Sequence, residues 1–90
     1  MRYNIQAGSH PAQVDITMDG NGGFTGVISH TEFGDGQITG GRASGDDLTG
    51  SVVLDGHTAK FEAKITGATI TGKLTVGWFW SQDFTGIQAA

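Results

Sequence analysis

The sequence of 90 residues contains no cysteine and only one proline. Without cysteine, the chain can form neither a disulfide framework nor a thiolate metal site. Positive charge is also scarce, because five Lys and Arg residues stand against nine Asp and Glu residues, for a formal net charge of −4. A surface that binds nucleic acid or an anionic membrane needs clustered Lys and Arg, so the composition argues against both kinds of partner.

Long apolar segments are missing as well. No stretch approaches the ~20 apolar residues that cross a bilayer, and residues 1–5 show no apolar core of a signal peptide. No window of helical length shows helical periodicity. We therefore expect a soluble, cytoplasmic, all-β protein with a single domain over residues 1–90.

Glycine, by contrast, is abundant, with sixteen copies, and part of it belongs to a repeated unit of the form apolar–Thr–Gly. The six copies of this unit begin at Phe24, Ile38, Leu48, Ile65, Ile70 and Phe84. Successive side chains of a strand point to opposite faces, so the apolar residue and the glycine share one face and the threonine takes the other. The repeats predict a sheet with an apolar, glycine-rich inner face and a threonine-rich outer face.

Alternation and turn signals divide the chain into eight expected strands. The alternation is strictest over residues 59–65 and 70–76, and Asp-Gly pairs between the runs suit two-residue hairpin turns. The least regular of the expected turns covers residues 81–83. We place the strands at residues 2–7, 12–18, 23–30, 36–43, 47–54, 57–65, 68–77 and 84–89.

Eight short antiparallel strands with hairpin connections and one buried face predict an up-and-down β-barrel, in which the last strand pairs with the first. Inward glycines permit the strong coiling that a small barrel needs. The alternative is a two-sheet sandwich of the same hairpins.

The pattern of glycines and apolar residues also supports a resemblance. It runs from Gly22-Gly23-Phe24 through Asp46-x-Leu48-Thr49-Gly50 to Phe84-x-Gly86, over almost the whole chain. In this pattern the chain resembles the small bacterial meander barrels of the lipocalin and streptavidin (calycin-like) type, although Arg2-Tyr3-Asn4 stands where lipocalins have Gly-x-Trp. The resemblance implies a barrel able to hold a small ligand, and it carries no catalytic residue across.

Arg42 has the inward parity of Ile38 and Gly40. An arginine inside a barrel needs an anionic partner, so it would mark a carboxylate or phosphate ligand or a buried acid. The alternative is a β-bulge at Gly40-Gly41, which would turn Ala43 inward and Arg42 outward. The sequence leaves both interpretations open.

The histidines are candidates for acid–base chemistry. His30 and His57 have inward parity at strand ends that share one rim of a meander barrel, and Glu32 follows His30 closely, so the three are candidate catalytic residues. The alternative is that these are solvated loop residues. His10, His30 and His57 are too scattered for metal-ligand spacing, and we expect no metal and no cofactor.

The run Trp78-Phe79-Trp80 is the most unusual local feature. Its tryptophans can plug the barrel end, stack on a flat apolar ligand at a binding mouth, or form a subunit interface. The outward parity of Val27 and Val53, together with Phe79, favours a homodimer.

These observations lead to three functional hypotheses. The first is binding of a small apolar or aromatic molecule, which could carry a negative charge, inside the barrel. Its expected ligand-binding residues are Tyr3, Phe24, Arg42, His57, Phe61, Trp78 and Trp80. The second is a small isomerase, cyclase or lyase that uses the histidines in the same cavity, and the third is a structural module with a filled core and an assembling outer face.

Overall fold

The computed structural model describes residues 1–31, 34–54, 56–77 and 80–89. Its secondary structure consists of eight strands. They are β1 (Arg2–Ala7), β2 (His10–Met18), β3 (Gly23–Ser29), β4 (Gly36–Ser44), β5 (Asp47–Leu54), β6 (His57–Thr66), β7 (Thr69–Val76) and β8 (Trp80–Gln88). Among the described residues there is no helix that could cross a membrane.

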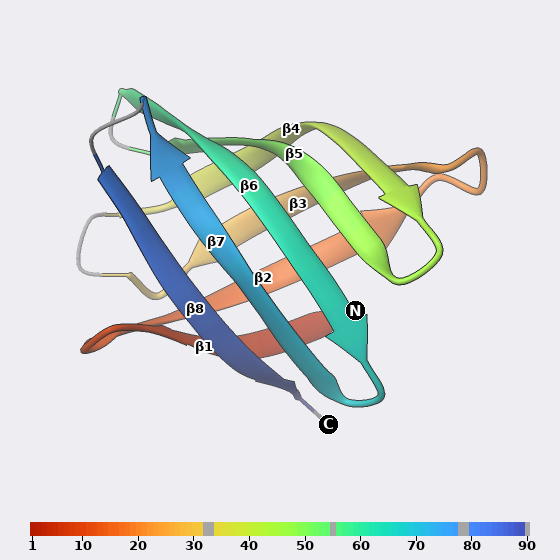
Figure 1. The fold of residues 1–90 in the computed structure, drawn as a ribbon, viewed down its shortest axis with the longest axis horizontal. Helices are drawn as coiled ribbons and strands as arrows, with labels where there is room; N and C mark the ends of the chain where they lie inside the picture. Colours follow the sequence, from red (N-terminus) through yellow and green to blue (C-terminus); the bar gives the residue numbers. More distant parts are fainter. Residues whose placement is uncertain (32–33, 55, 78–79, 90) are drawn as a thin grey trace.

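The strands form a closed barrel in which each strand pairs antiparallel with its neighbour in sequence, and β8 returns to pair with β1 (Figure 1). This confirms the predicted all-β, up-and-down barrel and excludes the two-sheet sandwich. The seam between β1 and β8 sets Ile5 opposite Gly86, and a hydrogen bond of 2.8 Å from Ala89 N to Arg2 O extends it. Because the sheet closes on itself, each described strand has a neighbour on both sides, and only residues 80–84 of β8 extend past the paired part of β1.

The strand boundaries follow the sequence prediction closely except in one place. Residues 81–83, expected as a turn, belong to β8, where Gln82 pairs with Leu74 of β7. β7 ends at Val76, and Gly77 directly after it has a φ of 60°. A polar residue on the inner face concealed the alternation that continues from Gln82 through Phe84 to Gly86.

The inner face pairs aromatic rings with glycines. The register sets Phe24 opposite Gly41, Phe61 opposite Gly50 and Phe84 opposite Gly72. Glycine has no side chain, so a ring can lie against the neighbouring backbone and fill a narrow barrel without crowding. The apolar–Thr–Gly unit thus supplies both the large residue and the space beside it.

A β-bulge in β4 decides where Arg42 points. The register of β4 shifts by one residue against both β3 and β5, and Gly40 adopts a φ of 62°. Gly41 is therefore buried, Arg42 is exposed and Ala43 faces inward. Of the two interpretations, the one that points Arg42 into the barrel is therefore wrong. The extra residue of the bulge reverses which of the following residues of β4 face inward.

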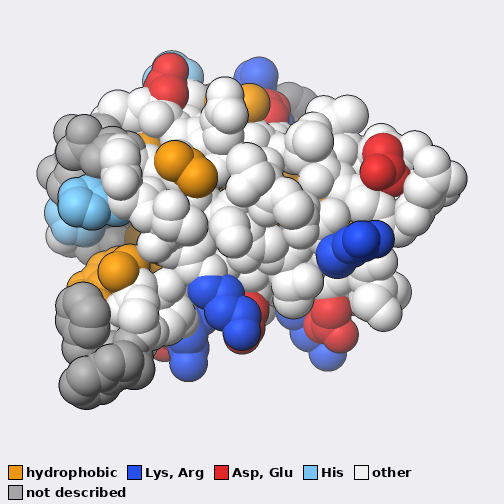
Figure 2. Space-filling view, turned by 90° about the horizontal axis from the view of Figure 1, so that it is seen from above, with side chains coloured by type: hydrophobic (Ala, Val, Ile, Leu, Met, Phe, Trp, Pro, Cys, Tyr) orange, Lys and Arg blue, Asp and Glu red, His pale blue; other side chains and the backbone are white. Residues whose placement is uncertain are grey.

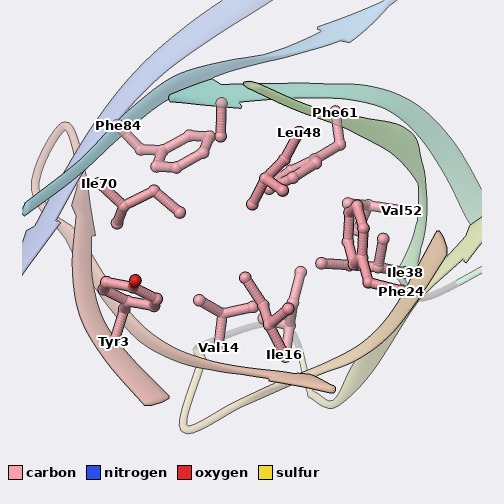
Figure 3. Packing of buried hydrophobic residues seen from close by; sticks show 12 residues of the cluster. Tyr3, Val14, Ile16, Phe24, Ile38, Leu48, Val52, Phe61, Ile70 and Phe84 are labelled. Atoms are coloured by element: carbon pink, nitrogen blue, oxygen red, sulfur yellow. The ribbon is translucent and has the colours of Figure 1, made fainter. Parts of the chain in front are cut away.

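The two ends of the barrel differ. We call the end that holds both termini the closed end, and the end where β1, β3, β5 and β7 finish the open end (Figure 1). The bulky inward side chains converge from all sides of the barrel, as Figure 3 shows for ten labelled residues. Tyr3, Leu48 and Ile70, which fill the core toward the closed end, are each no more than 1% exposed.

Candidate functional site: an apolar mouth

A cavity of about 310 Å³ opens at the open end of the barrel, and we call it the mouth. Its floor is formed by Ile28 and Val52, which also belong to the buried core. Its walls are apolar side chains packed on that core, chiefly Ile5, Leu54 and Leu74. The mouth is thus the unfilled space inside the barrel at its open end. Toward the closed end, side chains of the same inner face fill the interior.

Two small side chains on the inner face leave space at the open end. At the open end, β1 and β2 place Ala7 and Ala12 on the inner face, and Ala12 pairs directly with Ile5. Below them, the rings of Phe61 and Phe84 stack with centroids 5.6 Å apart. Large inward side chains therefore fill the barrel toward its closed end, whereas the small residues at the open end leave a cavity.

A second cavity adjoins the mouth beside Trp80. This cavity of about 240 Å³ is bordered by His57, Ala59 and Val76, and it shares with the mouth Trp80, the two wall leucines and one floor residue, Val52. Figure 2 shows hydrophobic and histidine side chains gathered at this end of the molecule. Trp80 is 45% exposed, so part of its surface is available to a bound molecule.

Polar groups in the mouth are few, and most stand on its lip. His10 and Thr31 border the opening, and Thr31 Oγ1 donates a hydrogen bond to Gly34 O. Gln82 lies deeper on β8, half-buried and between Trp80 and Phe84 on the inner face. Its Nε2 donates to the backbone O of Asp83 at 3.0 Å, while its side chain lies next to Gly8 of the β1–β2 turn.

The described lining of the mouth carries no Lys, Arg, Asp or Glu. All five basic residues are exposed on the outer face; they are Arg2, Arg42, Lys60, Lys64 and Lys73. Within the described part of the chain, Arg2 forms an ion pair with Asp15 at 2.9 Å, and Lys60 forms one with Glu62 at 3.3 Å. The site is therefore an apolar hollow with one amide and a rim of neutral or titratable polar groups.

Three residues expected to contact a ligand pack the core instead. Tyr3, Phe24 and Phe61 are between 1% and 3% exposed, and none of them lines the mouth. The Tyr3 hydroxyl points to Met1 Sδ at 3.9 Å, at the closed end. The alternating pattern placed them correctly on the inner face, but parity does not tell the filled end of a barrel from the open one.

The structure places His30 and His57 at the same rim, as the meander requires, but in separate hollows. His30 borders a groove beside β1 and β2, whereas His57 borders the hollow beneath Trp80. These two hollows share no described lining residue, and β4 and β5 lie between β3, which His30 follows, and β6, which His57 begins. Glu32, the third residue of that hypothesis, lies outside the described residues.

The aromatic run contributes one described residue, because Trp78 and Phe79 lie outside the described part of the chain. Trp80 begins β8 and borders the mouth, and its contact with a ligand stays a prediction. The sequence reasoning missed Gln82, Leu54 and Leu74 as lining residues. The inward parity of Leu54 and Leu74 could have predicted that they line the cavity. Gln82 could not be predicted in the same way, because the sequence prediction places it in a turn.

Neither metal binding nor known relatives define the site further. No group of three or more His, Asp or Glu side chains that could hold a metal ion occurs among the described residues. Comparison of the chain with protein-family models, with curated proteins and with solved structures finds no match. The case for function therefore depends on the geometry and chemistry of the mouth.

Proposed function

We propose that this protein binds a small, largely apolar molecule in the mouth of its barrel. The observation that carries the proposal is an accessible apolar cavity of about 310 Å³ directly above a solid core. Ligand sites are typically concave and mostly apolar, with a few polar groups that fix orientation, and their volumes begin near 300 Å³. A lipocalin- or streptavidin-like ligand-holding role agrees with the barrel architecture.

The size of the cavity limits the ligand. The core residues below the mouth are buried, and there Phe61 stacks on Phe84 and meets Phe24 edge to face. A long acyl chain could not enter the barrel without displacing them, which would forfeit their packing. The mouth therefore suits a compact ring-sized molecule that lies against Trp80 and the wall leucines.

A fluorescent apolar probe tests the proposal. The neutral dye N-phenyl-1-naphthylamine brightens on leaving water, so its titration with the protein measures apolar binding directly. Ala12→Leu fills the mouth from the wall, and we expect it to weaken dye affinity by about tenfold or more, or ~1.4 kcal/mol. Trp80→Ala should also weaken binding, since it removes an aromatic contact.

The matched control is Ala68→Leu, the same change at an exposed turn residue of the closed end. Equal dye affinity in Ala12→Leu, Ala68→Leu and the unmodified protein would contradict the proposal. Native mass spectrometry of the freshly purified protein gives a second readout. An added mass that disappears on denaturation would identify a retained ligand, and the same spectrum reports whether two copies associate.

Assembly is the weaker functional proposal. Val27 and Val53 are exposed on the outer face, 48% and 40% respectively, and Gln37 lies between them in one row across β3, β4 and β5. A stable interface usually buries about 800 Å² on each partner, far more than two valines supply. Ligand binding at the mouth has the better support.

A further inference from the structure

We infer that the mouth selects a flat, uncharged molecule that carries a hydrogen-bond donor, such as an indole-like or phenol-like ring. In this inference the side-chain carbonyl of Gln82 accepts the hydrogen bond from that donor. This inference deepens the proposed ligand binding and depends on it. Two independent observations carry it, namely the placement of one amide on the inner face and the distribution of charge over the barrel.

Gln82 is a polar residue among apolar neighbours on the inner face. Its neighbours on the inner face of β8 are Trp80 and Phe84, and its partner on β7 is Leu74. Within the described chain, the hydrogen bond of its side chain uses Nε2, which leaves the carbonyl Oε1 as an acceptor in a half-buried, apolar setting. The amide itself is open to water. A ring that lies over it would cover a hydrogen bond formed there, and a covered hydrogen bond discriminates more strongly than one formed at the surface.

The amide is placed to orient a ring. Gln82 and Trp80 are two residues apart on one strand, so their side chains stand on the same face, and both line the mouth. A planar ligand in contact with the tryptophan can turn its edge toward the carboxamide. An aliphatic molecule would fill the same volume but leave the Gln82 carbonyl without a partner, which costs affinity when water is displaced from it.

The charge distribution argues against an anionic ligand. Every Lys and Arg of the chain is exposed on the outer face, and the net charge is −4. A carboxylate taken into the apolar mouth would lose its hydration with no fixed cation to replace it. An inward Arg42 would have favoured an anionic ligand. Because Arg42 points outward, we infer a neutral ligand instead.

The test compares indole with indene, planar bicyclic molecules of nearly the same shape that differ in the N–H group. Affinities are measured from chemical-shift changes of backbone amides around the mouth in titrations followed by ¹H–¹⁵N NMR. We expect indole to bind about three- to tenfold more tightly than indene, the ratio that one neutral hydrogen bond provides. Indole-3-carboxylate should bind more weakly than indole, because it brings a charge.

Gln82→Leu keeps the apolar pattern of β8 and removes the amide, so the indole-to-indene ratio should fall to about one while indene still binds. Gln88→Leu changes the same residue type on the same strand at the exposed, closed end and should leave the ratio unchanged. Equal affinities in the unmodified protein, a ratio that survives Gln82→Leu, or tighter binding of the carboxylate would each overturn the inference while leaving apolar binding intact. If neither indole nor indene shifts the mouth, both the inference and the proposed function fail.

Discussion

At the residue scale, His30 is notable for its backbone. It follows the end of β3 with a φ of 57°, a left-handed conformation that costs a non-glycine residue about 1–2 kcal/mol. We predict that His30→Gly stabilises the protein by about 0.5–1 kcal/mol in urea unfolding, since glycine removes the strain but adds freedom to the unfolded chain. His57→Gly is the control, because His57 lies in β6 with no positive φ, and there glycine should destabilise by a similar amount. A loss of stability in both variants would contradict the prediction.

Asp19 supplies a pH-dependent contribution at the closed end. Its Oδ1 accepts hydrogen bonds from the backbone N–H of Asn21 at 2.7 Å and of Gly23 at 3.1 Å, and these hold its pKa below the ordinary value of 3.8. A carboxyl whose pKa is lower in the folded than in the unfolded state stabilises the fold above the ordinary value. That stabilisation is lost as the pH falls through the lowered pKa.

We therefore predict that the unmodified protein loses stability relative to Asp19→Asn as the pH falls below about 4. Asparagine still accepts the two backbone hydrogen bonds but carries no titrating charge, so it is the matched comparison. Urea midpoints measured between pH 2 and 7 give the difference, and NMR titration of the Asp19 carboxyl gives its pKa directly. A pKa at or above 3.8 would show that the turn does not stabilise the charge.

The sequence predicts the direction of most side chains but fails where one residue disturbs the parity. Phe24, Thr25 and Gly26 alternate inward and outward as the repeat requires. Arg42 does not follow the pattern, because a bulge beside it adds one residue, and the sequence could only name the two alternatives. Gln82 could not be assigned, because a polar inner-face residue has the same appearance in a sequence as a turn residue.

At the element scale, the two bulge glycines of β4 have different reasons to be glycine. Gly40 has a φ of 62° with open space around it, so the constraint is conformational. Gly41 has an ordinary φ, but a Cβ there would overlap the backbone O of Phe24 and lie 2.9 Å from two carbons of its ring. We predict that Gly40→Ala costs about 1 kcal/mol and Gly41→Ala about 2–3 kcal/mol, the range of an overpacked core.

The measurement is urea unfolding of both variants beside the unmodified protein. Because the aromatic ring covers Gly41, only Gly41→Ala should also shift the NMR signals of the Phe24 ring. Equal costs for the two variants would show that the ring and the glycine do not pack as closely as the register implies. A bulge that slides to relieve the overlap would reveal itself as an exchange of Arg42 and Ala43 between the two faces.

At the scale of the whole molecule, one sequence pattern produces a barrel whose two ends differ in structure. The same inward alternation fills the closed end with bulky residues such as Tyr3, Leu48 and Ile70, whereas at the open end it includes the alanines Ala7 and Ala12 among larger apolar residues. The barrel could be predicted because alternation and turn chemistry are local properties. Which end stays open could not, because it depends on how side-chain volumes from eight strands add up around one axis.

The position of the termini gives a final prediction. Both lie at the closed end, joined by the hydrogen bond of 2.8 Å between Ala89 N and Arg2 O, and the mouth is at the other end (Figure 1). A circular permutant that links the two ends through a short Gly/Ser segment and opens the chain between Gly45 and Asp46 keeps every strand pair. We expect it to fold with a loss of about 1 kcal/mol, since only one turn and one linker change.

The permutant should bind N-phenyl-1-naphthylamine as the unmodified protein does, because its cut and its linker both lie away from the mouth. The contrasting variant is the chain without residues 80–90, which loses β8, its seam with β1 and the Trp80 wall of the mouth. It would expose edges on β1 and β7, so we expect aggregation and no dye binding. Size-exclusion chromatography and dye titration separate the two variants, and a permutant that folds but has lost dye binding would show that the mouth depends on the closed end.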